Sequence, residues 1–137
     1  MKTAYVSGPI AGRPRLNRRA FYTAQHMLLN GGWDRALVPH DVAPWSHEGD
    51  CPGGYRSSPD APHAAACNLR TDLIEMLATA DTVFMLPGWE LSVGARLELQ
   101  VAAACGLEIH FLHQDVLDDW LSINPVLAKQ FPEDDSE

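Results

Sequence analysis

The chain has few cysteines and no long apolar run. Its three cysteines, Cys51, Cys67 and Cys105, are an odd number at irregular spacings among 137 residues. This usage does not suit a disulfide framework, so we expect reduced thiols. No run of about 18 apolar residues occurs, which argues against a membrane-spanning helix. Because a strand-like segment follows Met1 almost at once, we expect no signal peptide and a cytoplasmic protein.

Positive charge is also scarce. Ten Lys and Arg stand against 18 Asp and Glu, so the net charge is -8. This balance argues against a protein that follows a nucleic-acid backbone, but it allows a small charged ligand. Four of the basic residues follow the first glycine-rich loop: Arg13, Arg15, Arg18 and Arg19. Cations disfavour a helix N-terminus unless an anion is near, so the cluster favours a phosphorylated ligand over a merely solvated helix start.

The length of the chain fits one domain. At 137 residues the chain can bury about two thirds of its unfolded surface in a single core. We predict a single domain over residues 1–130. Residues 131–137 contain four acidic residues, and we expect them to form a disordered, solvated tail.

Two parts of the chain share a strand-loop-helix pattern. Lys2–Val6 is typical of a strand, Ser7–Gly12 of a turn-rich loop, and Leu16–Asn30 of an amphipathic helix whose inner side includes Leu29. Thr82–Leu86 is β-branched and aromatic without polar alternation, which indicates a parallel strand buried on both faces.

The strand Thr82–Leu86 leads into a helix whose N-terminus suits a bound anion. Ser92 is a candidate N-cap, and Gly94 lets a ligand approach the backbone amides at the helix N-terminus. Glu98 lies four residues beyond Gly94 and hence on the same helical face. We expect the packed face of this helix, which Glu98 borders, to carry Leu97, Val101 and Ala104.

The remaining segments complete a doubly wound sheet. Further strands are predicted at residues 36–38 and 108–112, and further helices at 64–79 and 116–121. We therefore predict a three-layer α/β fold with a parallel sheet of four or five strands, in the order 2-1-3-4 with right-handed crossovers. In this architecture ligands bind at the carboxyl ends of the strands, where both glycine-containing loops lie.

Several short motifs follow one another along residues 2–112. They are Tyr5-Val6-Ser7-Gly8-Pro9-Ile10-x-Gly12, Asn17 with Phe21, Arg70-x-Asp72-Leu73, Ala80-Asp81, and Leu86-Pro87-Gly88-Trp89-Glu90-x-Ser92-x-Gly94-Ala95-x-x-Glu98. In this order the chain resembles the nucleoside 2-deoxyribosyltransferase superfamily, which includes nucleoside deoxyribosyltransferases and nucleoside 5'-monophosphate N-glycosidases. The resemblance implies a flavodoxin-like fold and a homodimer. It also implies that Glu98 is the nucleophile, Asp72 positions the substrate, and Ser92 and Gly94 form the helix N-terminal pair.

The chemistry expected from this resemblance is cleavage of the N-glycosidic bond of a nucleotide or nucleoside. Glu98 would form a glycosyl-enzyme intermediate, and Asp72 would orient the sugar or assist proton transfer to the departing base. The predicted substrate-binding residues are Tyr5, Ser7, Gly8, Ile10, Gly12, Arg13, Ser92 and Gly94. No metal or organic cofactor is needed for this reaction.

The motifs leave three functions open. Hydrolysis and transfer use the same covalent intermediate, although the arginine cluster and Ser92 favour a monophosphate hydrolase over a nucleoside deoxyribosyltransferase. A nucleotide-binding sensor that keeps the fold without turnover is the alternative of another class. The ligand in all three is a small nucleotide or nucleoside, not a nucleic-acid polymer or a membrane.

Residues 39–63 are predicted to form a long surface loop rich in proline. Loops of this length are usually functional or mobile. In the resembling superfamily this region helps to cover the base, so Trp45 and Tyr55 are candidate stacking residues of a lid, and a passive insertion is the alternative. The pairs His47 with Cys51 and His63 with Cys67 offer ligand types that zinc prefers, but their spacing matches no common zinc pattern.

Overall fold

A four-stranded parallel sheet forms the centre of the computed structural model, which describes residues 1–42 and 65–132. The strands are β1 (Thr3–Ser7), β2 (Arg35–Leu37), β3 (Thr82–Met85) and β4 (Glu108–Phe111). They lie in the order β2-β1-β3-β4, which confirms the predicted α/β class, the parallel sheet and its strand order. Every residue of β1 and β3 is buried, as expected for strands covered on both faces.

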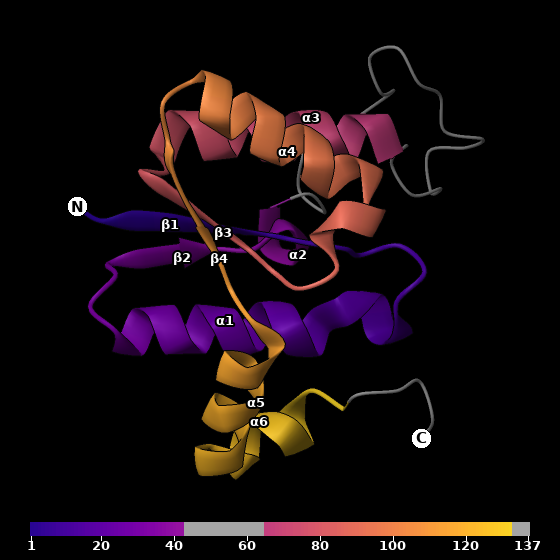
Figure 1. Ribbon diagram of the computed structural model, residues 1–137, viewed down its shortest axis with the longest axis vertical. Helices are drawn as coiled ribbons and strands as arrows, with labels where there is room; N and C mark the ends of the chain where they lie inside the picture. The colour runs from indigo at the N-terminus through magenta and orange to yellow at the C-terminus, as the bar shows by residue number, and fades with distance from the viewer. Residues whose placement is uncertain (43–64, 133–137) are drawn as a thin grey trace.

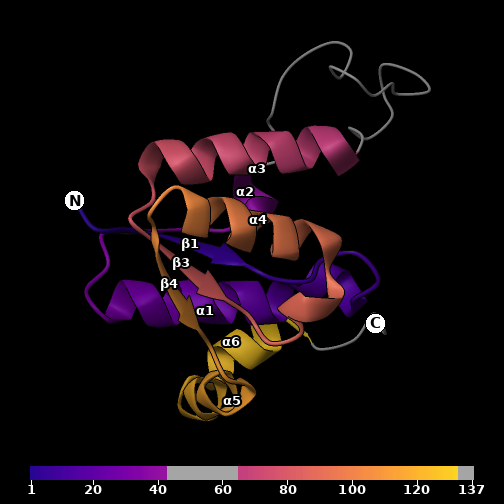
Figure 2. The same cartoon turned by 45° about the horizontal axis from the view of Figure 1, so that its top comes forward.

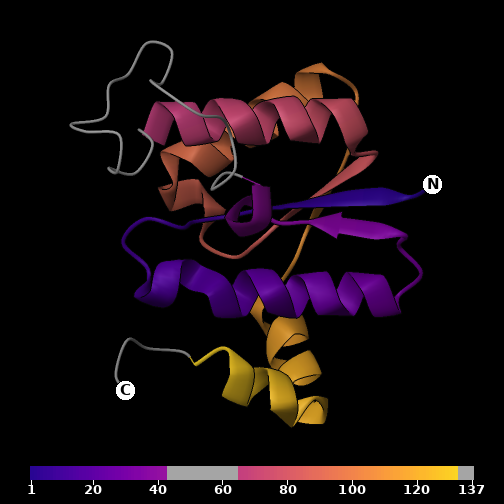
Figure 3. The same cartoon turned by 180° about the vertical axis from the view of Figure 1, so that it is seen from behind.

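Helices cover the two faces of the sheet and complete the three layers (Figure 1). On one face lie α3 (Ala65–Thr79) and α4 (Val93–Ala104), which stay together above the sheet in the turned view of Figure 2. On the other face lie α1 (Arg18–Asn30), α5 (Gln114–Ile123) and α6 (Pro125–Gln130). The view from behind shows α1 running along the full length of that face (Figure 3).

Alternate residues of β1 belong to opposite cores. Ala4 and Val6 pack with residues of α1 and α5, whereas Tyr5 packs with residues of α3 and α4. Because successive side chains of a strand point to opposite faces, Ser7 follows Tyr5 onto the α3–α4 face. Two hydroxyl groups of β1 are thus placed on the same side of the sheet.

The loops after β1 and β3 lie at one edge of the sheet (Figure 1). The first leads through the 3-10 helix η1 (Pro14–Asn17) into α1, and the second through η3 (Trp89–Leu91) into α4. The ends of the two strands are in register, since Ser7 pairs with Met85 and the Leu86 amide donates to the Ser7 carbonyl at 2.8 Å. Both loops therefore lie where ligands bind in doubly wound sheets.

The helix predicted from Leu16 begins only at Arg18. The backbone of Arg15, Leu16 and Asn17 is left-handed, with φ values of 50, 56 and 59°. Two contacts hold this turn: Asn17 Nδ2 donates to the Pro9 carbonyl at 2.8 Å, and His40 Nε2 lies 2.7 Å from the Leu16 carbonyl. Leu29, predicted on the inner side of the helix, is 45% exposed.

Other features also differ from the sequence prediction. The segment predicted as a loop from residue 39 starts with the short helix α2 (Pro39–Val42), and the rest of that loop, with Trp45 and Tyr55, lies outside the described residues. Helix α6 was not predicted. Phe131, assigned to the tail, stacks on Tyr22 with ring centroids 4.7 Å apart. Within the described ranges, no helix is long and apolar enough to cross a membrane.

The close approach of the loops after β1 and β3 can be tested at Gly8. A Cβ atom on Gly8 would lie 2.7 Å from Cβ of the buried Leu86. We expect Gly8→Ala to lower the free energy of unfolding by about 1–3 kcal/mol because one of the two loops must shift. Urea unfolding of the variant and the wild type measures this difference.

Gly94→Ala is the matched control. A Cβ atom there would meet only Leu69 Cδ1, at 3.9 Å, and the residue lies in the first turn of α4. This change should be neutral or raise stability by about 0.5–1 kcal/mol through helix propensity. A Gly8→Ala protein as stable as the wild type would contradict the close contact.

Candidate active site

Two carboxyl groups are buried on the α3–α4 face of the sheet. Glu98 on α4 is 4% exposed, and Asp72 on α3 is 6% exposed. Neither forms an ion pair with any residue that the structure describes. Acidic side chains are seldom fully buried without a basic partner, so the pair indicates a chemical role rather than a structural one.

Both oxygens of Glu98 accept hydrogen bonds from β1. The Tyr5 hydroxyl donates to Oε2 at 2.7 Å, and Ser7 Oγ donates to Oε1 at 2.6 Å. The two donors are one residue apart on the same face of the strand, which matches the spacing of the two carboxylate oxygens. Hydrogen bonds of this kind favour the charged form of a carboxyl group.

The pKa of Glu98 reflects two opposing effects. Burial is the larger effect and raises the pKa of Glu98 above the usual 4.5, while the hydrogen bonds from Ser7 and Tyr5 offset part of this rise. Burial, and then the negative charge of Glu98, raises the pKa of Tyr5 well above 10.0. Tyr5 therefore keeps its proton near neutral pH and remains a donor to Glu98.

Asp72 lacks the hydrogen bonds that Glu98 has. Its Oδ1 atom is buried and has no hydrogen-bond partner in the described part of the chain. Burial, and then the negative charge of Glu98, raises the pKa of Asp72 from 3.8 to about 8. At neutral pH Asp72 is thus protonated, while two hydroxyl donors favour the carboxylate of Glu98. Two neighbouring carboxyl groups whose surroundings favour different protonation states can serve as an acid and a nucleophile.

A cavity of about 520 Å³ opens one helical turn from the two carboxyl groups. Gly94 and Leu69 line this cavity. Gly94 lies four residues before Glu98 on α4, and Leu69 lies three residues before Asp72 on α3. Each carboxyl group therefore shares a helical face with a lining residue. The loop after β1 contributes the opposite wall with Pro9, Ala11 and Arg13. The volume lies within the range of about 300–1,000 Å³ that is usual for small-molecule sites.

Ser92 caps α4 at the rim of this cavity. Its Oγ accepts from the Ala95 amide at 3.2 Å while its own backbone is extended, which confirms the predicted N-cap. The first amides of a helix have no partner within the helix and carry partial positive charge. With Arg13 on the opposite wall, the rim of the cavity suits an anion.

Five of the eight predicted binding residues do not line the cavity. Ile10 packs against the α1 core on the other side of the sheet, and Gly8 lies against Leu86. Gly12 is exposed with a φ of 80° and serves the turn of the loop. Tyr5 and Ser7 act through Glu98, so only Arg13, Ser92 and Gly94 of the predicted group line the cavity.

Of the packed face predicted for α4, only Val101 packs against the core. Leu97 is 39% exposed and Ala104 is exposed, whereas Ala95, Glu98 and Ala102 are buried. The helix turns Glu98 toward the sheet because Tyr5 and Ser7 compensate its charge there. The spacing of apolar residues in the sequence gives no information about such polar contacts.

Sequence reasoning also missed the apolar residues of the cavity. Leu69, Leu91 and Val93 line it, although Leu91 is 85% and Val93 64% exposed. The sequence offered only two signals for these residues. Leu91 and Val93 flank Ser92, and Leu69 lies about one helical turn before Asp72. Exposed apolar side chains at a cavity suit a ligand with an apolar ring.

The zinc alternative cannot be placed in this site. His47, Cys51 and His63 lie outside the described residues, as does the side chain of Cys67. In residues 1–42 and 65–132 no three His, Cys, Asp or Glu side chains gather where they could hold a metal ion. Cys105 is a free, exposed cysteine.

Comparison with family models gives a match over the second half of the fold. Residues 53–111 match the model described as "Domain of unknown function (DUF4406)". This range is less than half of the chain, and it contains Asp72, Ser92 and Glu98 but not Tyr5 and Ser7. Comparisons with curated proteins and with solved structures give no match.

The raised pKa of Asp72 predicts how stability depends on pH. Because its pKa is about 8 in the folded protein instead of 3.8, the folded state holds this proton more tightly than the unfolded state. The resulting stabilisation is fully present below the unfolded pKa and is lost as pH rises through about 8. From about pH 6 to about pH 9, the free energy of unfolding should therefore fall more in the wild type than in Asp72→Asn.

Urea unfolding at several pH values measures this difference. Asp119→Asn is the control, because Asp119 is exposed on α5 and its variant should follow the wild type. If Asp72→Asn and the wild type lose stability in parallel, Asp72 is already ionised at low pH and the assignment of its protonation state is wrong.

Proposed function

We propose that this protein cleaves the N-glycosidic bond of a ribo- or deoxyribonucleoside 5'-monophosphate and releases the free base. The main support is the pair of buried carboxyl groups, in which hydroxyl donors favour a charged Glu98 while Asp72 holds a proton. The pair lies one helical turn from a cavity of suitable volume for such a ligand. The sequence resemblance to the nucleoside 2-deoxyribosyltransferase superfamily assigns roles to the same two residues.

In the first step the Glu98 carboxylate attacks C1' of the sugar while the bond from C1' to the base nitrogen breaks. The electron pair of that bond leaves with the base, and Asp72 donates its proton to the departing base. Positive charge develops on the sugar in an oxocarbenium-like transition state, which the nearby carboxylate stabilises. The products of this step are the free base and a glycosyl ester of Glu98.

In the second step water attacks C1' and breaks the ester bond. Asp72, now a carboxylate, accepts the proton of that water, which restores both carboxyl groups and releases the sugar phosphate. Tyr5 and Ser7 keep Glu98 in one orientation throughout, because each holds a different carboxylate oxygen. A nucleophile held in this way needs little reorganisation to react.

The phosphate is assigned to the rim formed by Ser92, the first amides of α4 and Arg13. The Arg13 side chain packs against Gly88 at the start of η3, so its guanidinium lies between the two loops at the sheet edge. Arginine and a helix N-terminus both favour a phosphate group. The apolar residues Leu69, Leu91 and Val93 would then contact the sugar or the base.

A nucleoside deoxyribosyltransferase is the second candidate. It would use the same glycosyl ester, with a second base in place of water as the attacking group. The apolar lining of the cavity suits an acceptor base as well as a leaving base. A nucleotide sensor is less well supported, because binding alone does not need two buried carboxyl groups beside the cavity.

The enzyme would act as a homodimer, as the resemblance implies. Leu91 and Val93 are exposed apolar residues at the rim of the cavity, and Ile74 on α3 is 60% exposed. Neighbouring exposed apolar side chains are typical of surfaces that another subunit covers. Such a subunit would also limit access of water to the cavity.

Release of free base from nucleosides and their monophosphates tests the reaction. We expect release by the wild type, measured by chromatography, and a loss of at least about 100-fold in turnover in Glu98→Gln, which removes the nucleophile. Ligand affinity should survive, because glutamine keeps the size of the side chain. Glu90→Gln, at an exposed position of η3, is the control and should keep full turnover.

The same assay separates the three functions. New nucleoside formed only when an acceptor base is present indicates a transferase. Nucleotide binding by calorimetry without base release indicates a sensor. Full turnover in Glu98→Gln would remove Glu98 from the mechanism.

The phosphate assignment is tested by comparing each monophosphate with its nucleoside. Monophosphates should bind more tightly, and Ser92→Ala should reduce that preference by about 1 to 2 kcal/mol. The preference is the difference in affinity between a monophosphate and its nucleoside for the same variant. A loss of stability from the missing N-cap affects both affinities equally and therefore does not change this difference. Ser122→Ala, on the exposed side of α5, should leave the preference unchanged. Equal affinity of the wild type for both forms would contradict a phosphate site at the rim.

A further inference from the structure

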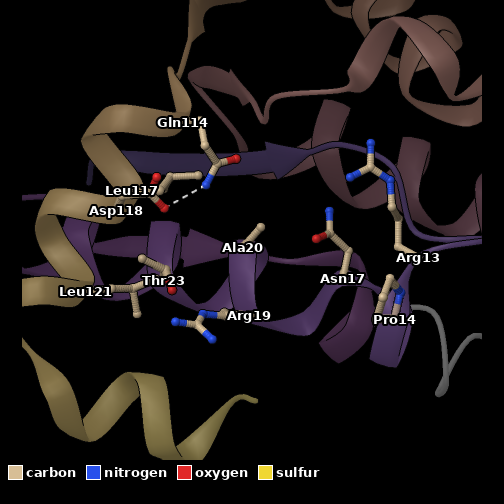
Figure 4. A pocket seen from close by; sticks show the side chains of 10 residues that line it. All are labelled: Arg13, Pro14, Asn17, Arg19, Ala20, Thr23, Gln114, Leu117, Asp118 and Leu121. Carbon is tan, nitrogen blue, oxygen red and sulfur yellow. Dashed lines mark hydrogen bonds between the residues drawn. The ribbon is translucent and has the colours of Figure 1, made fainter. Parts of the chain in front are cut away.

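A second cavity lies on the opposite face of the sheet, between the start of α1 and α5 (Figure 4). Its volume is about 430 Å³. Its floor includes Leu117, which belongs to the α1 core, whereas Glu98 and Asp72 lie on the α3–α4 face. This cavity is therefore separate from the candidate active site.

Thr23 gives this cavity an unused polar group. Its side chain is completely buried and is among those that line the cavity in Figure 4. Its Oγ1 atom has no hydrogen-bond partner in residues 1–42 and 65–132. A buried hydroxyl without a partner destabilises a fold, so its position on a cavity wall points to a bound group that supplies the partner.

Two guanidinium groups make the cavity positively charged. Arg13 and Arg19 both line it, and neither is ion-paired to a residue in the described part of the chain. Asp118, the acidic residue of the lining, accepts a hydrogen bond from Gln114 Nε2 at 3.0 Å. Positive charge gathered in one cavity of a protein with a net charge of -8 favours an anionic ligand.

The positions of these donors suit a phosphoryl group. Arg19 and Thr23 are four residues apart on α1 and hence on the same helical face, so one anion can contact both. The Arg19 guanidinium and the Thr23 hydroxyl can each donate to an oxygen of a phosphate monoester. Arg13 lies apart from these two residues in Figure 4 and adds positive charge to the lining. Beside them, Ala20, Leu117 and Leu121 offer apolar surface to the rest of the ligand.

We propose that this cavity binds a small organic phosphate, with its phosphoryl group at Arg19 and Thr23 and its apolar body on α5. Arg13 lines this cavity as well as the candidate active site. The two sites therefore share one cation at the edge of the sheet, and a ligand in either site changes the charge available to the other. Binding here needs no turnover and is independent of the proposed reaction.

Calorimetric titration with phenyl phosphate tests the site. We expect Arg19→Gln to raise the dissociation constant at least about tenfold, because it removes a charged donor. Arg96→Gln, at an exposed position of α4, and Ser92→Ala, at the other cavity, should leave this constant unchanged. Arg13→Gln should weaken both phenyl phosphate here and nucleotide at the candidate active site, whereas Arg19→Gln should weaken only the former.

Thr23→Val separates binding from folding. It keeps the shape of the side chain but removes the unpaired hydroxyl, so the Tm of the free protein should stay the same or rise. Phenyl phosphate affinity should nevertheless fall by at least about threefold. A purely structural Thr23 would leave the affinity unchanged.

Several outcomes would overturn the proposal. One is the absence of binding at millimolar phenyl phosphate, and another is binding that neither Arg19→Gln nor Thr23→Val weakens. Binding that only Ser92→Ala weakens would place the phosphate at the candidate active site instead. Benzoate binding as tightly as phenyl phosphate would show that the cavity recognises carboxylates as well and would contradict a phosphate site. Each titration can be repeated in Glu98→Gln, so its result does not depend on the proposed enzyme activity.

Discussion

The hydrogen bonds from Tyr5 and Ser7 to Glu98 are the interaction on which the rest of the site depends. They join β1 to α4 across 93 and 91 residues of sequence. A carboxylate can be buried only where its charge is compensated, and in the described part of the chain two hydroxyl groups do this without a basic residue. The rotation of α4 follows from this contact, and with it the position of Gly94 on the cavity wall.

The state of Asp72 depends on the same contact. The negative charge of Glu98 raises the pKa of Asp72, and in residues 1–42 and 65–132 hydroxyl donors reach Glu98 but not Asp72 Oδ1. Like charges in a buried site cannot both be ionised cheaply, so the proton stays on the group without donors. The different surroundings of the two carboxyl groups therefore arise from β1, whose hydroxyl groups both donate to Glu98.

The buried acidic side chains and the second cavity lie on opposite faces of the sheet, and the loop after β1 links the two faces. Buried acidic groups lie on the α3–α4 face, and Arg13 and Arg19 line the cavity at the start of α1. The left-handed turn of residues 15–17, held by Asn17 and by His40, links the loop that carries Arg13 to the helix that carries Arg19. Backbone conformations of this kind are costly for non-glycine residues and tend to persist at functional sites.

The sequence by itself determined the parallel sheet, its strand order and the N-cap at Ser92. It also singled out Glu98 and Asp72 as candidate site residues. Apolar β-branched runs, glycines and capping residues act locally, and the order of motifs gave the resemblance that singled out the two acids. The tertiary structure alone decided which face of α4 packs on the sheet, where Ile10 points, and that Thr23 and two arginines line one cavity. These features depend on atoms from distant segments. Tyr5 and Ser7 outweigh the apolar pattern that placed Leu97 and Ala104 in the core, because an uncompensated buried charge costs more than an exposed leucine.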